Sequence, residues 1–233
     1  MAERYSIYFT LPASDPLYVL ACRWLGHDIH QGDHDVGDLT DDLPAVLEAS
    51  RVVVGKAQKY GFHATLKAPF RLAADSSVKK LDNALRQFCA SQQAFACAPL
   101  ELAVMAGFIL LRPQQECAGL KRLADQCVEQ FDVFREPLSA KEFNKRHPKK
   151  LSEHQRSLLN QWGYPFVMDE FRFHMTLTKR IDEQQRNALL AALKEYLQPA
   201  LGAPFQVDRI YLCHQASAKQ KFNVIAEYPF GQA

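Results

Sequence analysis

The sequence of 233 residues predicts an α+β fold of two pseudo-symmetric lobes, with antiparallel sheets lining a central cleft and helices outside. Three observations predict it. The pattern F-H-x-T-L occurs at residues 62–66 and again at 173–177. Each copy precedes a segment with the spacing of an amphipathic helix, and then two segments typical of an antiparallel hairpin. The shared order indicates an internal duplication, so we expect a single two-lobed domain over 1–233 with repeats at about 60–112 and 171–228.

In the first half of the chain, proline and capping residues bound the expected elements. Asp15 followed by Pro16 is typical of a helix start, and Pro12 ends the strand before it. The expected elements are a strand at 4–11, a helix at 15–25, a polar loop at 26–42, the first motif strand at 60–70, a helix at 76–91, and hairpin strands at 94–103 and 106–112.

The second half gives similar signals. Ser152 and Asp182 are expected helix N-caps, and apolar residues recur at helical spacing in 115–133 and 182–197. The expected elements are helices at 115–133 and 152–161, the second motif strand at 171–179, a helix at 182–197, and closing hairpin strands near 204–213 and 221–228.

The composition shows no strong charge bias. The chain has 28 basic and 26 acidic residues, and this formal net charge of +2 gives no global electrostatic case for binding duplex nucleic acid. No apolar run reaches the roughly 18 to 20 residues of a membrane span, and the N-terminus lacks a signal-peptide pattern. Six scattered cysteines favour reduced thiols. We expect a cytoplasmic protein with no membrane partner, and a monomer.

The repeated motif places polar groups on one face of each strand. Because side chains alternate along a strand, the His and the Thr share one face while Phe, the variable residue and Leu share the other. The polar faces therefore carry two imidazoles and two hydroxyls: His63, Thr65, His174 and Thr176. Histidine is the side chain best suited to proton transfer near neutral pH. The motifs predict a paired acid–base site with His63 and His174 as catalytic residues.

Two cations fall on the same expected faces, Lys67 in the first strand and Arg172 in the second. Hydroxyl and cationic donors can hold the non-bridging oxygens of a phosphodiester, while one imidazole accepts a proton and the other donates one. The symmetry leaves open which imidazole does which. A single His-x-Thr in a strand is more often structural, and the two cations could be rim charges, but the second copy of the motif favours a functional site.

These motifs resemble the signature of the two-histidine (2H) phosphoesterase superfamily, whose LigT-like fold carries two H-x-[TS] motifs in two symmetric lobes. The resemblance covers the opening strand, both motif strands, and the helix and hairpin after each. It implies that cyclic phosphodiesters are hydrolysed or formed without a metal. It also implies that His63 and His174 are the catalytic pair, and that the hydroxyls of Thr65 and Thr176 bind phosphate.

Within that superfamily, the sequence is most similar to the branch of phosphonate metabolism proteins associated with carbon–phosphorus lyase gene clusters. The similarity rests on residues 4–9, 24–26, 60–70, 162–165 and 171–178. Through this association, the resemblance implies a cyclic ribose phosphate of phosphonate catabolism as substrate. No residue of the sequence identifies that substrate by itself.

Further binding residues are expected beside the motifs. Tyr8, Tyr60 and Tyr164 could contact a sugar or phosphate, or pack as ordinary aromatic residues. The basic stretch 141–150 could steer a polyanionic substrate or RNA toward the cleft, with Arg146 gripping phosphate. A solvated linker between the lobes is the alternative interpretation of this stretch.

One loop has a composition that could bind a metal. His27, His30 and His34, with aspartates nearby, could supply nitrogen and oxygen ligands. Spacing alone does not orient ligands on a loop, and paired-histidine chemistry needs none. We favour a polar surface loop, and we expect no metal and no cofactor.

The sequence thus predicts a metal-independent phosphoesterase that opens a small cyclic phosphodiester, either a cyclic ribose phosphate or a nucleoside 2′,3′-cyclic phosphate. Its expected partner is a small phosphorylated substrate. Two alternatives stay open. One is a non-catalytic RNA- or nucleotide-binding module, and the other is an RNA 2′-5′ ligase-like transesterification within the same chemistry.

Overall fold

A seven-stranded antiparallel sheet forms the centre of the protein, in the order β4-β5-β6-β2-β1-β8-β9. The computed structural model describes residues 3–32, 43–146 and 148–231. The seven strands are β1 (Arg4–Phe9), β2 (Ala64–Phe70), β4 (Leu100–Met105), β5 (Phe108–Pro113), β6 (Met175–Thr176), β8 (Arg209–Gln215) and β9 (Asn223–Pro229). A small second sheet pairs β3 (Phe95–Cys97) with β7 (Phe205–Val207).

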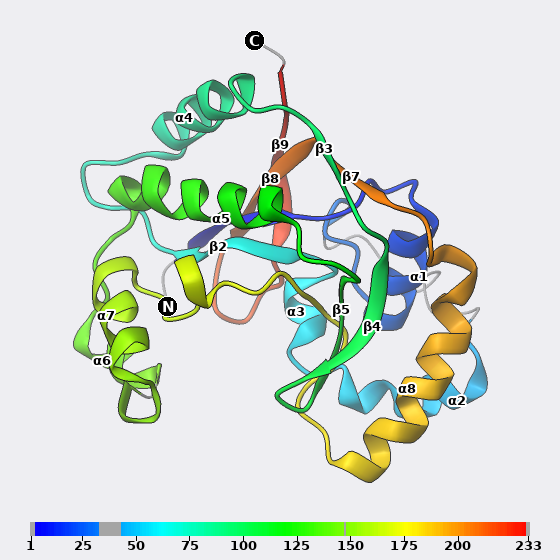
Figure 1. Ribbon diagram of the computed structural model, residues 1–233. Coiled ribbons are helices and arrows are strands. Elements are labelled where there is room, and N and C mark those ends of the chain that lie inside the picture. The colour runs from blue at the N-terminus through cyan, green and yellow to red at the C-terminus, as the bar shows by residue number, and fades with distance from the viewer. Residues whose placement is uncertain (1–2, 33–42, 147, 232–233) are drawn as a thin grey trace.

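Helices surround this sheet, and the predicted α+β class is confirmed (Figure 1). The helices are α1 (Pro16–Leu25), α2 (Ala45–Ser50), α3 (Ala57–Tyr60), α4 (Val78–Ala90), α5 (Ala118–Phe131), α6 (Ala140–Lys145), α7 (Glu153–Trp162) and α8 (Glu183–Leu197), with short 3-10 turns η2 (Arg51–Val53), η3 (Asp132–Phe134), η4 (Pro148–Lys150), η5 (Met168–Glu170) and η6 (Gln198–Ala200). Within the described part of the chain, no helix has the length and apolar content that crossing a bilayer requires.

Capping side chains set the starts of the longer helices. Asp15, Ser77, Ser152 and Asp182 each accept a hydrogen bond from a backbone N–H in the first turn of α1, α4, α7 and α8. These bonds satisfy donors that the helix itself leaves unpaired. The predicted starts of these four helices are therefore confirmed to within two residues.

The apolar faces of both motif strands lie in one hydrophobic core. Its members from the motifs are Phe62, Ala64, Leu66, Met175 and Leu177, with Phe173 packed against them. Helix α5 packs on β2, and α4 packs on β8 and β9, so helices cover this face of the sheet (Figure 1). Each large side chain buried there stabilises the fold by about 1.5–3 kcal/mol. The core thus holds the two motif strands side by side.

The two hairpins cross over between the motif strands. The β4–β5 hairpin follows β2 in the chain, yet β5 pairs with β6. The β8–β9 hairpin follows β6 in the chain, yet β8 pairs with β1, which pairs with β2. Each sequence repeat therefore contributes its hairpin to the side of the sheet that holds the other motif strand. That order leaves β2 and β6 as direct neighbours.

Three predicted strands differ from the structure. The segment predicted as one strand at 94–103 is divided into β3 and β4 around Pro99, which has no N–H to donate to a ladder. The segment at 204–213 is likewise divided into β7 and β8, because β7 leaves to pair with β3. The second motif strand, predicted over 171–179, is regular only at Met175–Thr176.

A β-bulge changes the face on which Lys67 lies. Thr65 pairs with Tyr8, but the next pair joins Lys67, not Leu66, to Ile7. The extra residue turns Lys67 to the core side of the sheet, where Ile7 is buried. The prediction that Lys67 shares a face with His63 is therefore wrong, because strict alternation does not survive a bulge.

The turn before the first motif depends on a glycine. Gly61 has φ +69° and ψ −174°, a backbone conformation open almost only to glycine. A Cβ built on Gly61 would lie 1.9 Å from Cγ2 of Ile29 and 3.2 Å from Cδ2 of His27. Both the conformation and the close approach therefore require glycine at this position.

We expect Gly61→Ala to lower the free energy of unfolding by about 2–4 kcal/mol, since it combines backbone strain with a clash. Urea denaturation measures this loss. Gly202→Ala is the matched control, because Gly202 also has a positive φ, +104°, but no heavy atom lies within 4 Å of its Cβ position. Equal losses for the two variants would contradict a packing requirement at Gly61.

Candidate active site

The two motif histidines directly precede two neighbouring strands, His63 before β2 and His174 before β6. Ala64 of β2 pairs with Met175 of β6 in antiparallel register. One residue to either side, this register sets His63 opposite Thr176 and His174 opposite Thr65. Opposite residues share a face, so all four side chains lie on the side away from the core. The two histidines are diagonal neighbours, for which the spacing is about 7–8 Å.

Both imidazoles are anchored in the same way. His63 Nδ1 lies 3.0 Å from the carbonyl oxygen of Gly61, and His174 Nδ1 lies 2.7 Å from that of Arg172. A carbonyl accepts only, so each Nδ1 must carry the proton that it donates. This assigns the tautomer and leaves each Nε2 free to exchange a proton. Sequence analysis had no direct signal for these anchors, which are backbone carbonyl groups two residues before each histidine.

His63 is held in a largely desolvated place. Its ring stacks on the Tyr8 ring, with the centroids 3.8 Å apart and the planes 28° apart. Its Nε2 accepts a hydrogen bond from the Thr65 hydroxyl at 3.2 Å. The pKa of His63 is lowered to about 4, mainly by burial. The hydrogen bond to the Gly61 carbonyl raises this pKa, and the nearby His174 and His27 lower it. His63 is therefore neutral at pH 7, with Nε2 ready to accept a proton.

Tyr8 supports His63 from the neighbouring strand. It pairs with Thr65 across β1 and β2 and is fully buried, in a small cluster with Tyr211, Cys213 and Phe222. Burial raises the pKa of the Tyr8 hydroxyl well above its usual value, so Tyr8 stays neutral. The structure thus places the Tyr8 ring against a catalytic candidate, with its face stacked on the imidazole.

The two cations predicted on the motif faces are engaged elsewhere. Lys67 donates to Asp132 Oδ1 at 3.0 Å and to the Val128 carbonyl at 3.2 Å, and burial lowers its pKa while Asp132 raises it. Arg172 is exposed, and its Nη1 donates to the carbonyls of Asp169 and Phe171. A phosphate-binding role for either residue stays a prediction.

An open pocket lies near His63, although the motif histidines and threonines are not among the residues that line it. Tyr60 lines it and lies 6.2 Å from the His63 ring, centroid to centroid. Tyr164 also lines the pocket, and the Arg146 guanidinium lies 5.1 Å from the Tyr164 ring centroid. The structure therefore brings four residues predicted from the sequence into the lining of one pocket, since Lys67 lines it as well. The predicted basic stretch is not an extended linker there, because most of it forms α6 and η4.

Cations from a second segment line the same pocket, and sequence analysis did not single them out. Lys56 and Lys59 both precede the first motif, Lys56 as the N-cap of α3 and Lys59 in its last turn. Their spacing in the sequence, three residues apart just before Tyr60, was the available signal. Arg4 on β1 completes this side of the pocket.

The described part of the histidine-rich loop uses its side chains for structure. His27 Nε2 lies 2.8 Å from the Phe222 carbonyl, and His30 Nε2 lies 3.3 Å from the Leu11 carbonyl. Asp28 accepts from the Tyr18 hydroxyl at 2.5 Å. His34 lies outside the described residues. Among residues 3–32, 43–146 and 148–231, no group of three or more His, Cys, Asp or Glu side chains is arranged to hold a metal ion.

Two curated proteins resemble this chain over nearly its whole length. One, from Janthinobacterium sp. (strain Marseille), is 30% identical over 231 residues, which are 97% of this chain and 51% of that protein. Another, from Laribacter hongkongensis (strain HLHK9), is 29% identical over 218 residues, 92% of this chain and 49% of that protein. Both are named ribose 1,5-bisphosphate phosphokinase PhnN. The chain spans about half the length of these relatives.

Solved structures resemble it more distantly. E. coli LigT in apo form aligns over 99% of this chain and 98% of its own, with 14% identity and a TM-score of 0.49. E. coli LigT complexed with NADP+ covers both chains fully, with 13% identity and a TM-score of 0.47. A structure described as a phosphoesterase also covers both chains fully, with 12% identity and a TM-score of 0.45.

The sequence itself places the chain in a family. A family model described as "Protein of unknown function (DUF1045)" matches residues 65–223. That range includes the second motif and begins at the Thr of the first. Since the match spans well over half of the sequence, this chain belongs to the DUF1045 family.

Proposed function

We propose that this protein is a metal-independent phosphoesterase that hydrolyses a small cyclic phosphodiester by paired-histidine acid–base catalysis. The observation that carries the proposal is the pairing of Ala64 with Met175, the residues that directly follow His63 and His174. Two imidazoles at diagonal positions, each with Nδ1 tied to a carbonyl, can direct both Nε2 atoms at one phosphorus centre.

His63 is the general base in this proposal. It is neutral at pH 7 because burial lowers its pKa to about 4. Nε2 of His63 takes a proton from water as the water oxygen bonds to phosphorus. The bond from phosphorus to one ring oxygen breaks, and His174 Nε2 donates a proton to that leaving oxygen. The product is a phosphate monoester with a new hydroxyl, and both imidazoles return to their starting states by proton exchange with solvent.

The motif threonines would hold the non-bridging oxygens. Thr65 lies opposite His174 in the register, and Thr176 lies opposite His63. Each hydroxyl is thus beside the imidazole of the other motif. When substrate binds, the Thr65 hydroxyl can exchange its bond to His63 Nε2 for one to a phosphate oxygen. Charge that develops on these oxygens would then meet donors already in place.

A cyclic ribose phosphate is the substrate class we favour, with a nucleoside 2′,3′-cyclic phosphate as the other. The two curated relatives are named for ribose 1,5-bisphosphate, and opening a cyclic phosphate on ribose yields a ribose phosphate. Because this chain matches only about half of each relative, the kinase activity in their names is not assigned to it. The relatives support a ribose phosphate as the shared chemistry.

A binding module without catalysis is the competing function. The basic pocket beside His63 would suit RNA or a nucleotide, through cations and aromatic rings. Such a module needs neither imidazole to exchange a proton. It predicts binding that survives replacement of either histidine, and no turnover of cyclic substrates.

We expect His63→Asn and His174→Asn each to lower kcat by about 10²–10⁴-fold, since each removes one proton-transfer group. Asparagine retains a donor for the carbonyl anchor, so the fold should persist by circular dichroism. Hydrolysis of ribose 1,2-cyclic phosphate, followed by ³¹P NMR, measures the loss. His154→Asn is the control, because His154 is exposed and bonds to Asp169 on the surface. Activity retained by both motif variants would contradict paired-histidine catalysis, whereas no turnover by the unsubstituted protein would support the binding module.

The pH dependence of kcat/KM tests which imidazole is the base. Protonation of His63 removes the acceptor, and burial lowers the pKa of His63 from 6.5 to about 4. The acidic limb of the kcat/KM profile, which reports the free enzyme, is therefore expected near pH 4. A limb near pH 6.5 would contradict the assignment of His63 as the base.

A further inference from the structure

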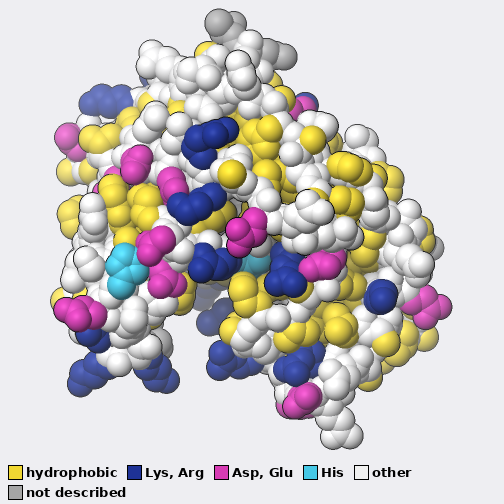
Figure 2. All heavy atoms as spheres, viewed as in Figure 1, with side chains coloured by type: hydrophobic (Ala, Val, Ile, Leu, Met, Phe, Trp, Pro, Cys, Tyr) yellow, Lys and Arg dark blue, Asp and Glu magenta, His cyan; other side chains and the backbone are white. Residues whose placement is uncertain are grey.

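The pocket beside His63 is larger and more basic than the opening of a cyclic phosphate requires. It has a volume of about 980 Å³, at the upper end of the range for small-molecule sites. Figure 2 shows a notch between the α6–α7 segment and the rest of the molecule, with Lys and Arg side chains on both walls. The reaction proposed for the motif histidines and threonines does not require these cations.

Some of the cations in the pocket are neutralised by carboxylates. Arg71 is paired with Glu136 and Glu142, and Asp132 is shared by Lys67 and Arg135. The hydrogen bond from Arg71 lowers the pKa of Glu142 to about 2, so this pair stays charged at neutral pH. These contacts account for the acidic groups that line the pocket.

The remaining cations have no carboxylate at salt-bridge distance among the described residues. They are Arg4, Lys56, Lys59, Lys141, Lys145 and Arg146. Arg4 and Lys59 donate to uncharged oxygens, the side-chain oxygen of Gln215 and the backbone carbonyl of Ala218. Like charges gathered in one open pocket repel one another, and an anion in the pocket would relieve that repulsion.

The fold fixes where Arg146 sits. Helix α6 begins with a capping box between Ser139 and Glu142. Glu142 also accepts from Arg71, which follows β2 directly, so α6 is tied to the end of the first motif strand. Arg146 then caps the other end of α6 and lies over the Tyr164 ring. This arrangement holds a planar guanidinium, a group suited to bidentate phosphate binding, at a set place in the pocket.

Aromatic rings connect this cation with the catalytic histidine. Tyr164 lies close enough to Tyr60 and Arg146 for both to affect its pKa, which burial raises. Tyr60 stacks on Phe222 with the centroids 5.4 Å apart, and its ring centroid lies 6.2 Å from that of His63. A sugar could lie along these rings, with one end at His63 and the other at Arg146.

We propose that this pocket binds a separate phosphate monoester on the same substrate, so that the preferred substrate is a cyclic phosphodiester carrying a second phosphate. Arg146 is the principal ligand, with Lys145 and Lys59 beside it. The proposal rests on the proposed function, because it takes the cyclic phosphate to react at His63 and His174. It adds the class of substrate: a cyclic phosphate of ribose or of a nucleoside that carries a second phosphate is preferred to one that does not.

The test compares substrates that differ by one phosphate. The pairs are ribose 1,2-cyclic phosphate with and without a 5-phosphate, and adenosine 2′,3′-cyclic phosphate with and without a 5′-phosphate. The readout is a ratio: kcat/KM for the substrate with the second phosphate, divided by kcat/KM for the substrate without it. For the unsubstituted protein we expect a ratio of roughly 10 to 100 in at least one pair, since charge-assisted hydrogen bonds to a dianion carry energies of that order. The ratio should fall as salt is added.

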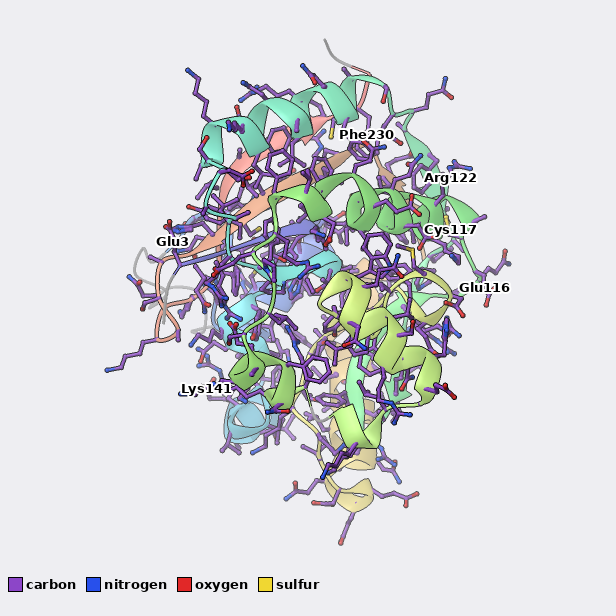
Figure 3. All side chains as sticks on the ribbon, turned by 90° about the vertical axis from the view of Figure 1, so that its left-hand side faces the viewer. Glu3, Glu116, Cys117, Arg122, Lys141 and Phe230 are labelled. Atoms are coloured by element: carbon purple, nitrogen blue, oxygen red, sulfur yellow. The ribbon has the colours of Figure 1, made fainter. Side chains whose placement is uncertain are left out.

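Arg146→Gln should bring that ratio toward one, and Arg146→Gln with Lys145→Gln should bring it further. Arg122→Gln is the matched control, because Arg122 is an exposed arginine on α5 that does not line the pocket. Figure 3 shows Arg122 and Lys141 on opposite sides of the molecule. The control should keep the full ratio, and thermal unfolding checks that all variants fold.

The outcomes separate this proposal from the one on which it rests. Turnover with a ratio near one would overturn the second-phosphate site and leave the phosphoesterase standing. A high ratio that Arg146→Gln does not change would overturn the assignment to this pocket. No turnover of any substrate would overturn both proposals. Faster turnover of an RNA oligonucleotide ending in a 2′,3′-cyclic phosphate than of either phosphorylated small substrate would assign the cations to RNA.

Discussion

The pairing of β2 with β6 is the contact on which the site depends. These strands are separated by more than a hundred residues in the chain, and Ala64 opposite Met175 joins them. Both of these residues face the core, and their neighbours on the other face are the motif histidines and threonines. A shift of this pairing by one residue would move the His and Thr of one motif to the core face of the sheet. The buried side chains of the two apolar faces therefore fix the spacing of the imidazoles.

The crossed hairpins explain how that pairing is supported. The β4–β5 hairpin supports β6 from one side, while β1 and the β8–β9 hairpin support β2 from the other. Neither motif strand is at an edge of the sheet. Their backbone groups therefore do not form an open edge with which another chain could pair. The regular part of β6 is two residues long, and its position depends on these neighbours rather than on its own length.

Much of the site followed from alternation along a strand. His63, Thr65, His174 and Thr176 could be assigned to polar faces because Phe62, Leu66, Met175 and Leu177 had to face a core. Alternation assigned Lys67 to the wrong face, because a β-bulge cannot be recognised in a single sequence. The lowered pKa of His63 also lay beyond sequence analysis, since it comes from burial beside Tyr8, a residue on another strand.

The position of an oxyanion relative to the two imidazoles tests the central claim most directly. Vanadate adopts the five-coordinate geometry of a phosphoryl transfer, and a crystal structure of the protein with vanadate would locate it. We expect vanadium between the two motifs, with Nε2 of His63 and Nε2 of His174 each at hydrogen-bond distance from a different vanadate oxygen. An ion held by only one imidazole, or by neither, would contradict it.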